Sequence, residues 1–392
     1  MSEMSYLEKL LDGAEVEWKR LGDVVRIKNG KDHKSLGEGE FPVYGSGGIM
    51  RYADTYAYNK PSVLIPRKGS LGNLFFVDAP FWTVDTIFYT EIDEAQIHPK
   101  YLYYFLTTVG LGEMNQAGGV PSQTQSVLNK LKIPIPCPGA PEKSLAIQSK
   151  IVRILDKFSA LTTELAAELT ARKKQYNHYR DQLLSFDEDE VEWKALGDIT
   201  KLITKGTTPK KFVDDGVNFI KLENFDNNRI KTDKLMFIPE SVHFKELKRS
   251  ILKANDILFA IAGATIGKCA IVDETLLPAN TNQALAIIRT SEMVNVRFVF
   301  YYLQTRSMKE YIARFNKTSA QPNLNLNQMS NFKIPVPSIE EQLRIVSILD
   351  KFDALTSSIT EGLPREIELR QKQYEYYRDM LFSFPKPKVA EA

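Results

Sequence analysis

The sequence lacks the features of membrane-spanning, secreted and disulfide-stabilised proteins. Its 392 residues contain no run of about 18 apolar residues, so we expect no membrane span. The first segment, Met1–Leu11, is acidic and contains no continuous apolar run, which does not fit a signal peptide. The two cysteines, Cys137 and Cys269, lie far apart and form no metal-ligand pattern. We therefore expect a protein of a reducing compartment, the cytoplasm.

Motifs for bond-making chemistry are also missing. There is no Walker A loop and no Asn/Asp-Pro-Pro-aromatic motif of amino-methyltransferases, and Gly45-Ser-Gly-Gly48 lacks the flanking pattern of a cofactor-binding loop. Glu192-Trp-Lys194 has no Pro-Asp partner upstream, which argues against a nuclease site. The four histidines have no metal or triad spacing: His33, His98, His178 and His243. We therefore expect no catalytic residue, no metal and no cofactor in this chain.

The overall charge of +2 does not indicate a nucleic-acid partner, but its distribution is uneven. Residues 24–131 contain 10 basic and 10 acidic side chains, whereas residues 199–331 contain 19 basic and 12 acidic ones. The second region could favour a polyanion. An ordinary solvated surface with some imbalance explains the same numbers equally well.

An internal repeat is the strongest signal in the sequence. Four motifs, which we call the frame, occur twice in the same order: Val16–Asp23 and Val191–Asp198, Lys132–Pro136 and Lys333–Pro337, Ile151–Thr162 and Ile345–Thr356, and Gln175–Phe186 and Gln373–Phe384. Between them, residues 24–131 and 199–331 share little sequence. Duplication followed by drift should make the two copies diverge equally in the frame motifs and in the segments between them. Here the frame motifs stay similar while the segments between them differ, which indicates that the two parts have different roles.

The repeat divides the chain into segments. We expect a helical stub at 1–15, a first globular domain at 16–138, a first long helix at 139–188, a second globular domain at 189–338, a second long helix at 339–386, and a disordered tail at 387–392. Tyr6–Leu11 resembles Tyr179–Leu184, so the stub looks like the end of a helix unit. Docking of the stub beside the C-terminal helix would close the chain into a roughly two-fold, circular arrangement.

Apolar residues at three- and four-residue steps predict two long coiled-coil helices. The first is expected at about 143–185, after Pro138 and Pro141, and about 40 residues would span ~60 Å. Gly362 and Pro364 predict a kink or short break in the second. The seam positions are Ile151, Ile154, Phe158, Leu161, Leu165 and Tyr176 in the first helix, and Ile345, Ile348, Phe352, Leu355, Ile359 and Tyr374 in the second.

Both globular domains have the pattern of mixed α/β structure with short strands bounded by Gly, Pro or Asp. Strands are expected at 42–44, 63–65, 74–77 and 86–89, and at 219–222, 257–259, 269–272 and 284–288. Residues 100–106 and 296–303 predict one short helix near the end of each domain. The predicted fold class is α+β, with two mixed α/β domains joined by two long antiparallel helices.

The loops between these elements hold small, polar and basic residues of the kinds that contact DNA bases and phosphates. The candidates are Lys31, Lys34, Ser46, Arg51, Arg67, Lys68, Gln123 and Gln125 in the first domain, and Lys205, Thr207, Lys210, Lys211, Arg229, Lys231, Lys317, Gln321 and Asn323 in the second. Any one of these loops, taken alone, is more often an ordinary polar surface. The collective pattern carries the hypothesis.

The frame motifs resemble those of the specificity subunits of type I restriction–modification systems, along the whole chain. The most specific are Ile133-Pro-Ile-Pro136 with its counterpart Ile334-Pro-Val-Pro337, the paired Gln-Tyr-x-x-Tyr-Arg-Asp segments, and the four-residue helix repeat that ends in Thr163-Glu-Leu165 and Ala167-Glu-Leu169. Together with Ser5–Leu11, this helix repeat is similar to the IC subfamily.

The resemblance implies that the two globular domains are target recognition domains. Each would read one half of a split, asymmetric DNA site through the major groove, with the helices as a ruler and the four-residue repeat setting the spacing. The chain would bind two methylation subunits, which methylate adenine with S-adenosylmethionine, and two ATP-dependent restriction subunits. S-adenosylmethionine, ATP and magnesium would then belong to those partners. The first domain departs from the expected pattern because it is short and not net basic.

Two other hypotheses are consistent with the same residues. One is a coiled-coil adaptor whose two domains bind proteins or peptides. The other is an autonomous enzyme that acts on DNA without partner subunits.

Overall fold

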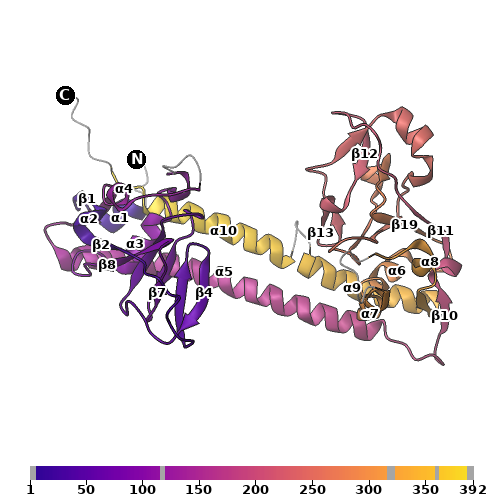
Figure 1. Cartoon of the computed structure of the whole chain (residues 1–392), viewed down its shortest axis with the longest axis horizontal. Helices are drawn as coiled ribbons and strands as arrows, with labels where there is room; N and C mark the ends of the chain where they lie inside the picture. The colour runs from indigo at the N-terminus through magenta and orange to yellow at the C-terminus, as the bar shows by residue number, and fades with distance from the viewer. Residues whose placement is uncertain (1–5, 115–119, 316–322, 358–361, 386–392) are drawn as a thin grey trace. The chain divides into compact units, whose positions relative to one another are not determined.

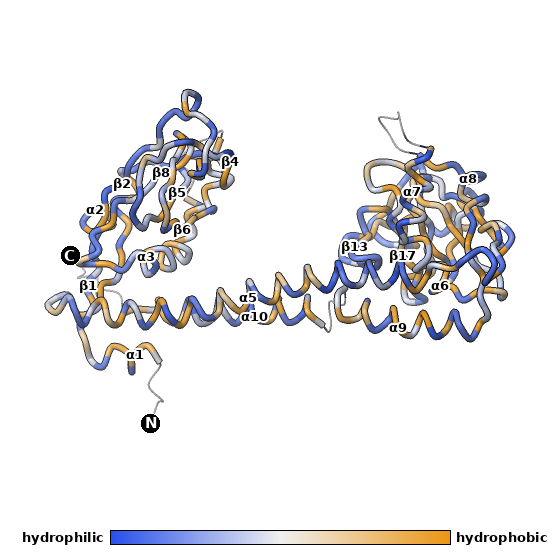
Figure 2. Tube along the Cα trace, turned by 90° about the horizontal axis from the view of Figure 1, so that it is seen from below, coloured by the Kyte–Doolittle hydropathy of each residue, from blue (hydrophilic) through white to orange (hydrophobic). Residues whose placement is uncertain are grey.

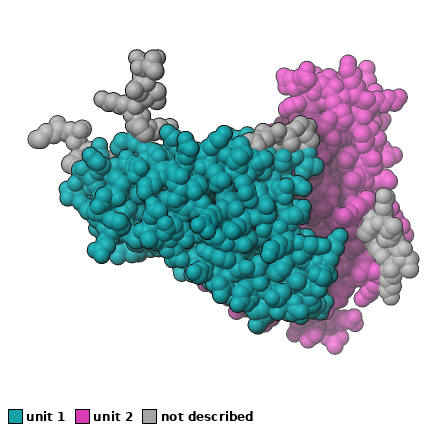
Figure 3. All heavy atoms as spheres, turned by 60° about the vertical axis from the view of Figure 1, so that its left-hand side comes forward, with its two compact units in different colours: residues 1–164, 367–392 teal, residues 165–366 magenta. Residues whose placement is uncertain are grey.

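The computed structural model describes residues 6–114, 120–315, 323–357 and 362–385, and the chain divides into two compact units (Figure 3). Unit 1 comprises residues 1–164 and 367–392, and unit 2 comprises residues 165–366. Both boundaries fall inside long helices. Each unit is therefore a globular domain packed together with its own portion of helix, whereas the sequence predicts a division between domain and helix.

Each globular domain contains a four-stranded antiparallel sheet of the same topology. In unit 1 the strand order is β2 (Val25–Asn29), β8 (Ile87–Ile92), β5 (Ser62–Pro66) and β6 (Phe75–Val77). In unit 2 it is β11 (Thr200–Lys205), β19 (Leu285–Thr290), β16 (Ile257–Ala260) and β17 (Cys269–Ile271). Strands β5 and β16 are buried throughout, in keeping with their nearly continuous apolar sequences.

A three-stranded sheet is repeated in the same way. Its central strand pairs antiparallel with one neighbour and parallel with the other, in the orders β4 (Gly48–Ala53), β3 (Phe41–Gly45), β7 (Trp82–Thr83) and β15 (Met236–Ile238), β12 (Val217–Ile220), β18 (Ala279–Thr281). The longer second domain adds a hairpin of β13 (Phe225–Asp226) and β14 (Arg229–Ile230). All of the strands predicted from the sequence are confirmed, with ends shifted by at most three residues; the largest shift is at the end of β8, which runs to Ile92.

The frame motifs at the two ends of each globular domain pair with one another. Strand β1 (Val16–Arg20) runs antiparallel to β9 (Lys132–Pro136), with Trp18 opposite Pro134. Strand β10 (Glu192–Ala195) pairs with β20 (Lys333–Val336), with Trp193 opposite Pro335. Two-stranded ribbons tolerate these prolines because an edge strand can turn an absent N–H outward. Each domain is thus closed at its base by its own frame strands, a pairing that the sequence reasoning missed.

Short helices complete the domains. They are α1 (Tyr6–Leu11), α2 (Leu21–Val24), α3 (Pro99–Leu106) and α4 (Gln125–Leu128) in unit 1, and α6 (Val296–Tyr302), α7 (Arg306–Phe315) and α8 (Leu326–Ser330) in unit 2. Single turns lie at 111–113, 196–199, 222–224, 242–246, 248–250 and 274–276. The predicted helices at 100–106 and 296–303 are confirmed as α3 and α6.

The long helices are α5 (Pro141–Leu183), α9 (Ile339–Ser357) and α10 (Gly362–Leu381) (Figure 1). Apolar and polar residues alternate along them (Figure 2). Helix α5 starts and ends within two residues of the prediction. In unit 2 it runs antiparallel to α9, since Tyr179 stacks on Phe352 at 5.9 Å while Leu183 and Arg344 line one hollow further along. In unit 1, Phe158 of α5 stacks on Tyr377 of α10 at 5.2 Å.

The second long helix is described as α9 and α10, and the predicted interruption at Gly362 and Pro364 falls on the first turn of α10. Residues 358–361 lie outside the described chain. Gly362 has a left-handed φ of 77°. A Cβ at this position would come within 2.7 Å of the carbonyl oxygens of Ala354 and Leu355 at the end of α9. Only glycine therefore fits without strain.

The N-terminal stub and the C-terminal helix end share one core in unit 1. Leu7 and Leu11 of α1 belong to the same buried cluster as Leu381 and Phe382, and the Trp18 Nε1 donates to the carbonyl oxygen of Pro385 at 2.7 Å. The predicted docking of the stub beside the C-terminal helix is thereby confirmed. Both cysteines are buried and free.

Candidate nucleic-acid interface

Loops from four parts of unit 1 converge at one end of its sheets. The backbone N–H of Lys31 donates to the Thr83 carbonyl at 2.8 Å, and the preceding Gly30 lies so close to the Val84 carbonyl that a Cβ would overlap it. The backbone N–H groups of Ser46 and Arg67 meet at Thr86, on its hydroxyl at 3.3 Å and its carbonyl at 2.8 Å respectively.

Two further hydrogen bonds fasten the fourth loop to this end of unit 1. Gln123 Nε2 donates to the Pro66 carbonyl at 2.6 Å, and Gln125 Nε2 donates to Asn29 Oδ1 at 3.2 Å. Lys68 also bridges to Ser122 in a short strand-like pairing. The loops that carry the predicted polar side chains of the first domain therefore form one cluster, the unit 1 loop cluster.

Unit 2 has an equivalent cluster at the equivalent strand ends. Gly206 packs against the carbonyls of Thr281 and Asn282, and the Thr207 N–H donates to the Thr281 carbonyl at 3.0 Å. Ala262 pairs with Asn323, as Lys68 pairs with Ser122 in unit 1. The two clusters share a backbone arrangement but differ in side chains.

The structure places most of the predicted DNA-contact residues in these clusters as exposed side chains. Lys31, Lys34, Lys68, Lys205, Thr207, Lys210 and Lys211 are exposed, and Ser46, Arg67 and Gln125 are partly exposed. Asn323 is exposed at its bridge to Ala262. Lys317 and Gln321 lie outside the described residues. Because DNA contact requires accessible donors, the exposed lysines remain the best candidates.

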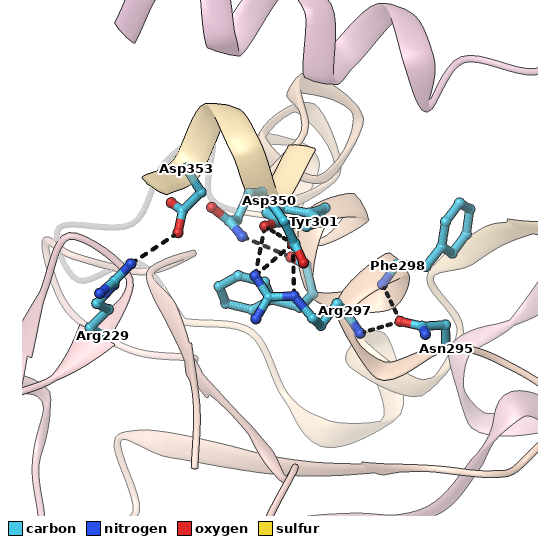
Figure 4. Close-up of polar contacts among 9 residues, drawn as sticks. Arg229, Asn295, Arg297, Phe298, Tyr301, Asp350 and Asp353 are labelled. Atoms are coloured by element: carbon cyan, nitrogen blue, oxygen red, sulfur yellow. Dashed lines mark hydrogen bonds and ion pairs between the residues drawn. The ribbon is translucent and has the colours of Figure 1, made fainter. Parts of the chain in front are cut away.

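Four of the predicted DNA contacts need correction or refinement. Gln123 is only 1% exposed and is a buried structural residue, not a DNA contact as predicted. Arg51 donates to the carbonyls of Leu36 and Gly37 at 2.7 and 2.9 Å and so holds the loop that follows Lys34. Arg229 lies in strand β14 of the additional hairpin, 3.6 Å from Asp353 of α9 (Figure 4), and Lys231 follows that strand.

A polar clamp, repeated in both units, fixes each globular domain to a long helix. In unit 1, Asp156 of α5 accepts hydrogen bonds from Lys100 at 2.9 Å and the Tyr104 hydroxyl at 2.7 Å, both on α3. In unit 2, Asp350 of α9 accepts from Arg297 at 2.8 Å and the Tyr301 hydroxyl at 2.6 Å, both on α6 (Figure 4).

A glutamine pair extends the clamp. Gln148 accepts from the backbone N–H of His98, and Gln342 accepts from that of Asn295, each at 2.8 Å. His98 and Asn295 in turn cap the first turns of α3 and α6 with their side chains. Sequence reasoning missed this clamp, although Asp156 and Asp350 hold the same position in a shared motif.

Burial controls the ionisation of the clamp tyrosines. It raises the pKa of both Tyr104 and Tyr301, and the hydrogen bond to the neighbouring aspartate raises it further. Each phenol therefore stays protonated near neutral pH and donates to a carboxylate, which is a strong, charge-assisted hydrogen bond.

The long helices bury one face and expose another. Ile151 and Ile345 are fully buried, and Tyr176 is 6% exposed, as a seam requires. The other predicted seam residues Ile154, Phe158, Leu165, Ile348, Phe352 and Tyr374 are partly buried, and Ile359 lies outside the described residues.

Leu161 and Leu355 are exceptions, because they are 36% and 38% exposed. Lys157 and Lys351, one helical turn earlier, are also exposed. The same lysine–leucine pair is thus presented to solvent in each unit, and we call it the repeated helix face.

Two other features, a membrane-spanning helix and a metal-ligand group, are not found in the described part of the chain. None of its helices has both the length and the apolar character that a bilayer crossing needs. Within the same residues, no three His, Cys, Asp or Glu side chains are grouped so that they could hold a metal ion.

Comparison with known proteins identifies relatives along the whole chain. Residues 14–172 and 188–369 match the family described as Type I restriction modification DNA specificity domain. The sequence is 42% identical over 406 residues to the type I restriction enzyme EcoR124I/EcoR124II specificity subunit of Escherichia coli, covering 99% of both chains. It is 34% identical over 400 residues to a putative type I restriction enzyme specificity subunit of Haemophilus influenzae, covering 97% of this chain and 98% of the relative.

The fold is similar to a solved structure as well. The crystal structure of the S subunit of a type I restriction–modification system from M. genitalium aligns with a TM-score of 0.56 at 18% sequence identity, covering 98% of this chain and 100% of that one.

Proposed function

The chain belongs to the type I restriction–modification DNA specificity family, whose members are non-catalytic DNA-recognition subunits. On that premise we propose separate roles for its globular domains and its long helices. Each globular domain reads one half of a bipartite, asymmetric DNA site, and the long helices set the spacer between the halves. The observation that carries this proposal is the pair of loop clusters, which share a backbone arrangement and differ in side chains. Two such clusters suit two unlike half-sites.

The repeated clamp supports a rigid coupling between recognition and spacing. Asp156 and Asp350 hold α3 and α6 on the long helices with charged hydrogen bonds, so each domain keeps a fixed position on its portion of helix. In α5, one more four-residue unit after Leu169 would add ~6 Å and rotate the remainder of the helix by ~40°. We expect such an insertion to lengthen the spacer and leave both half-sites unaltered.

Type I specificity subunits work with methylation and restriction subunits, and the repeat supports a stoichiometry. If two identical partner subunits bind this chain in the same way, the chain must present the same binding surface twice. The repeated helix face, Lys157 with Leu161 and Lys351 with Leu355, offers a charged and an apolar contact in each unit. We therefore propose two methylation subunits, which carry S-adenosylmethionine for adenine methylation, and through them two restriction subunits that use ATP and magnesium. The cytoplasm, where both cysteines stay reduced, is the expected location.

The test is DNA binding by the assembled methylation complex. We expect weak or no binding by the chain alone, and tight, salt-sensitive and sequence-specific binding once methylation subunits are added. Replacing residues 24–131 with another recognition domain should change one half-site only, as read by sequencing of methylated host DNA. Equal affinity of the complex for all duplexes, or a change in both halves, would contradict the proposal. Capture of a protein partner with no DNA retention would favour a coiled-coil adaptor instead.

A further inference from the structure

Strand β4 of unit 1 carries an exposed apolar edge. It lies at the edge of its three-stranded sheet (Figure 1). Its residues Ile49, Met50 and Tyr52 are 49%, 60% and 52% exposed. Soluble proteins usually protect edge strands with charged residues or proline, because an apolar edge invites association. A cluster of exposed apolar side chains at this position therefore indicates a contact surface.

A β-bulge sets the direction of this edge. Val43 is opposite Arg51 while Tyr44 is opposite Ile49, so Met50 is the extra residue. The bulge breaks the alternation that would otherwise bury every second side chain, and it leaves two successive apolar residues exposed. Bulges of this kind re-aim side chains near functional sites. The Met50 side chain bends back over Gly45, since a Cβ there would meet its sulfur.

This apolar edge adjoins the unit 1 loop cluster. The β3–β4 turn is fastened by Ser46 to Thr86 and by Asn73, whose Nδ2 donates to the Ser46 carbonyl at 3.3 Å. Through its bonds to Leu36 and Gly37, Arg51 of the same strand holds the loop that follows Lys34. Gly69, which follows Lys68, also lies close to the Ser46 hydroxyl. The apolar edge is therefore joined through the backbone to the loops that carry the exposed Lys34 and Lys68.

The composition of this surface favours DNA over a protein partner. Lysine is depleted in the cores of protein–protein interfaces, whereas it is one of the common donors to DNA phosphates. The major groove displays one strongly apolar group, the C5-methyl of thymine. Because residues 24–131 carry no net charge, this domain also has less electrostatic attraction for DNA than the second one.

On the basis of the proposed function, we propose that Ile49 and Met50 form a thymine-reading edge that contacts thymine methyl groups in the first half-site. The first domain thus gains sequence specificity from apolar contacts to the bases, while nearby lysines contact the DNA phosphates. The first half-site accordingly contains at least one thymine at a position that tolerates no other base.

The probe is deoxyuridine, which pairs like thymine and lacks only its methyl group. We would replace each thymine of the first half-site, on either strand, in a duplex that the assembled methylation complex binds. At least one replacement should weaken binding about fourfold, the change implied by ~0.8 kcal/mol for a buried group of this size. In Met50→Ala or Ile49→Ala complexes, the same replacement should cost nothing further.

Met293→Ala is the matched control, because Met293 is 50% exposed in unit 2 and far in sequence from the loop cluster. It should leave both the affinity and the deoxyuridine effect unchanged. The Met50 variant should also keep the slope of log Kd against log salt, since a methyl contact releases no counterions. Unchanged melting temperatures would show that the variants fold.

Several outcomes would overturn the proposal. These are a first half-site without thymine, deoxyuridine effects below twofold at every position, and effects that persist in both variants. Weaker assembly of the Met50 variant with its methylation subunits, in the absence of DNA, would assign the edge to a protein partner. A wild-type complex that binds no duplex specifically would instead refute the proposed function itself.

Discussion

Asp350 provides the most direct test of the clamp between a recognition domain and a long helix. Its carboxylate is 2.6 Å from the guanidinium of Arg297 and also accepts the Tyr301 hydroxyl at 2.6 Å. The perturbation is Asp350→Ala, which removes both contacts and leaves the cation without its counter-charge.

The magnitude depends on the exposure of the pair. A hydrogen bond to a charged group contributes about 1.5–3 kcal/mol, and two that share one carboxylate do not add fully. Asp350 and Arg297 are 40% and 41% exposed, so water replaces part of the lost interaction. We expect Asp350→Ala to lower the free energy of unfolding of unit 2 by about 2 kcal/mol.

The assay is hydrogen exchange of α6 together with urea unfolding. Local opening should increase amide exchange in residues 296–302 about 30-fold for 2 kcal/mol. The control is Asp353→Ala, one turn further along α9, which loses only a 3.6 Å ion pair to an exposed arginine and should cost about 0–1 kcal/mol. Equal effects of the two substitutions would refute the reasoning, as would a double-mutant cycle of Arg297 and Asp350 with no coupling energy.

Three further perturbations test the local physics of the fold. Burial lowers the pKa of His98 below its ordinary 6.5, so the stabilisation that neutral His98 gives to unit 1 is present above that pH and is lost as the pH falls through the folded pKa. The substitution His98→Asn, which copies the Asn295 cap, should remove this loss of stability between pH 7.5 and 5.5, as measured by urea unfolding. An unchanged pH dependence in the variant would contradict this reasoning. Asp256 is fully buried with two 2.7 Å hydrogen bonds from Arg289, so Asp256→Ala should cost about 3–5 kcal/mol by urea unfolding, and less than 1 kcal/mol would refute a structural ion pair. Gly362→Ala should cost about 1–2 kcal/mol, because its left-handed φ and the nearby α9 carbonyls disfavour a Cβ, and a neutral effect on thermal stability would count against this.

Sequence patterns of short range predicted much of this molecule. The three- and four-residue apolar steps predicted α5 to within two residues at each end, since a helix is specified by contacts one turn apart. Short apolar runs such as Val63–Ile65 predicted buried strands for the same reason. The exposed positions Leu161 and Leu355 fit the apolar period equally well, so periodicity could not distinguish a seam from a repeated outer face.

Contacts between distant residues were decided only by the tertiary structure. The sequence by itself determined that the frame occurs twice and that the loops between its motifs are polar. It did not determine that Trp18 lies opposite Pro134 or that Gln123 is buried. Nor did it determine that Asp156 and Asp350 accept hydrogen bonds from α3 and α6. The physical reason is that a side chain's partners depend on which segments the fold brings together, and polar residues of the same type serve as DNA contact, cap or clamp according to that neighbourhood.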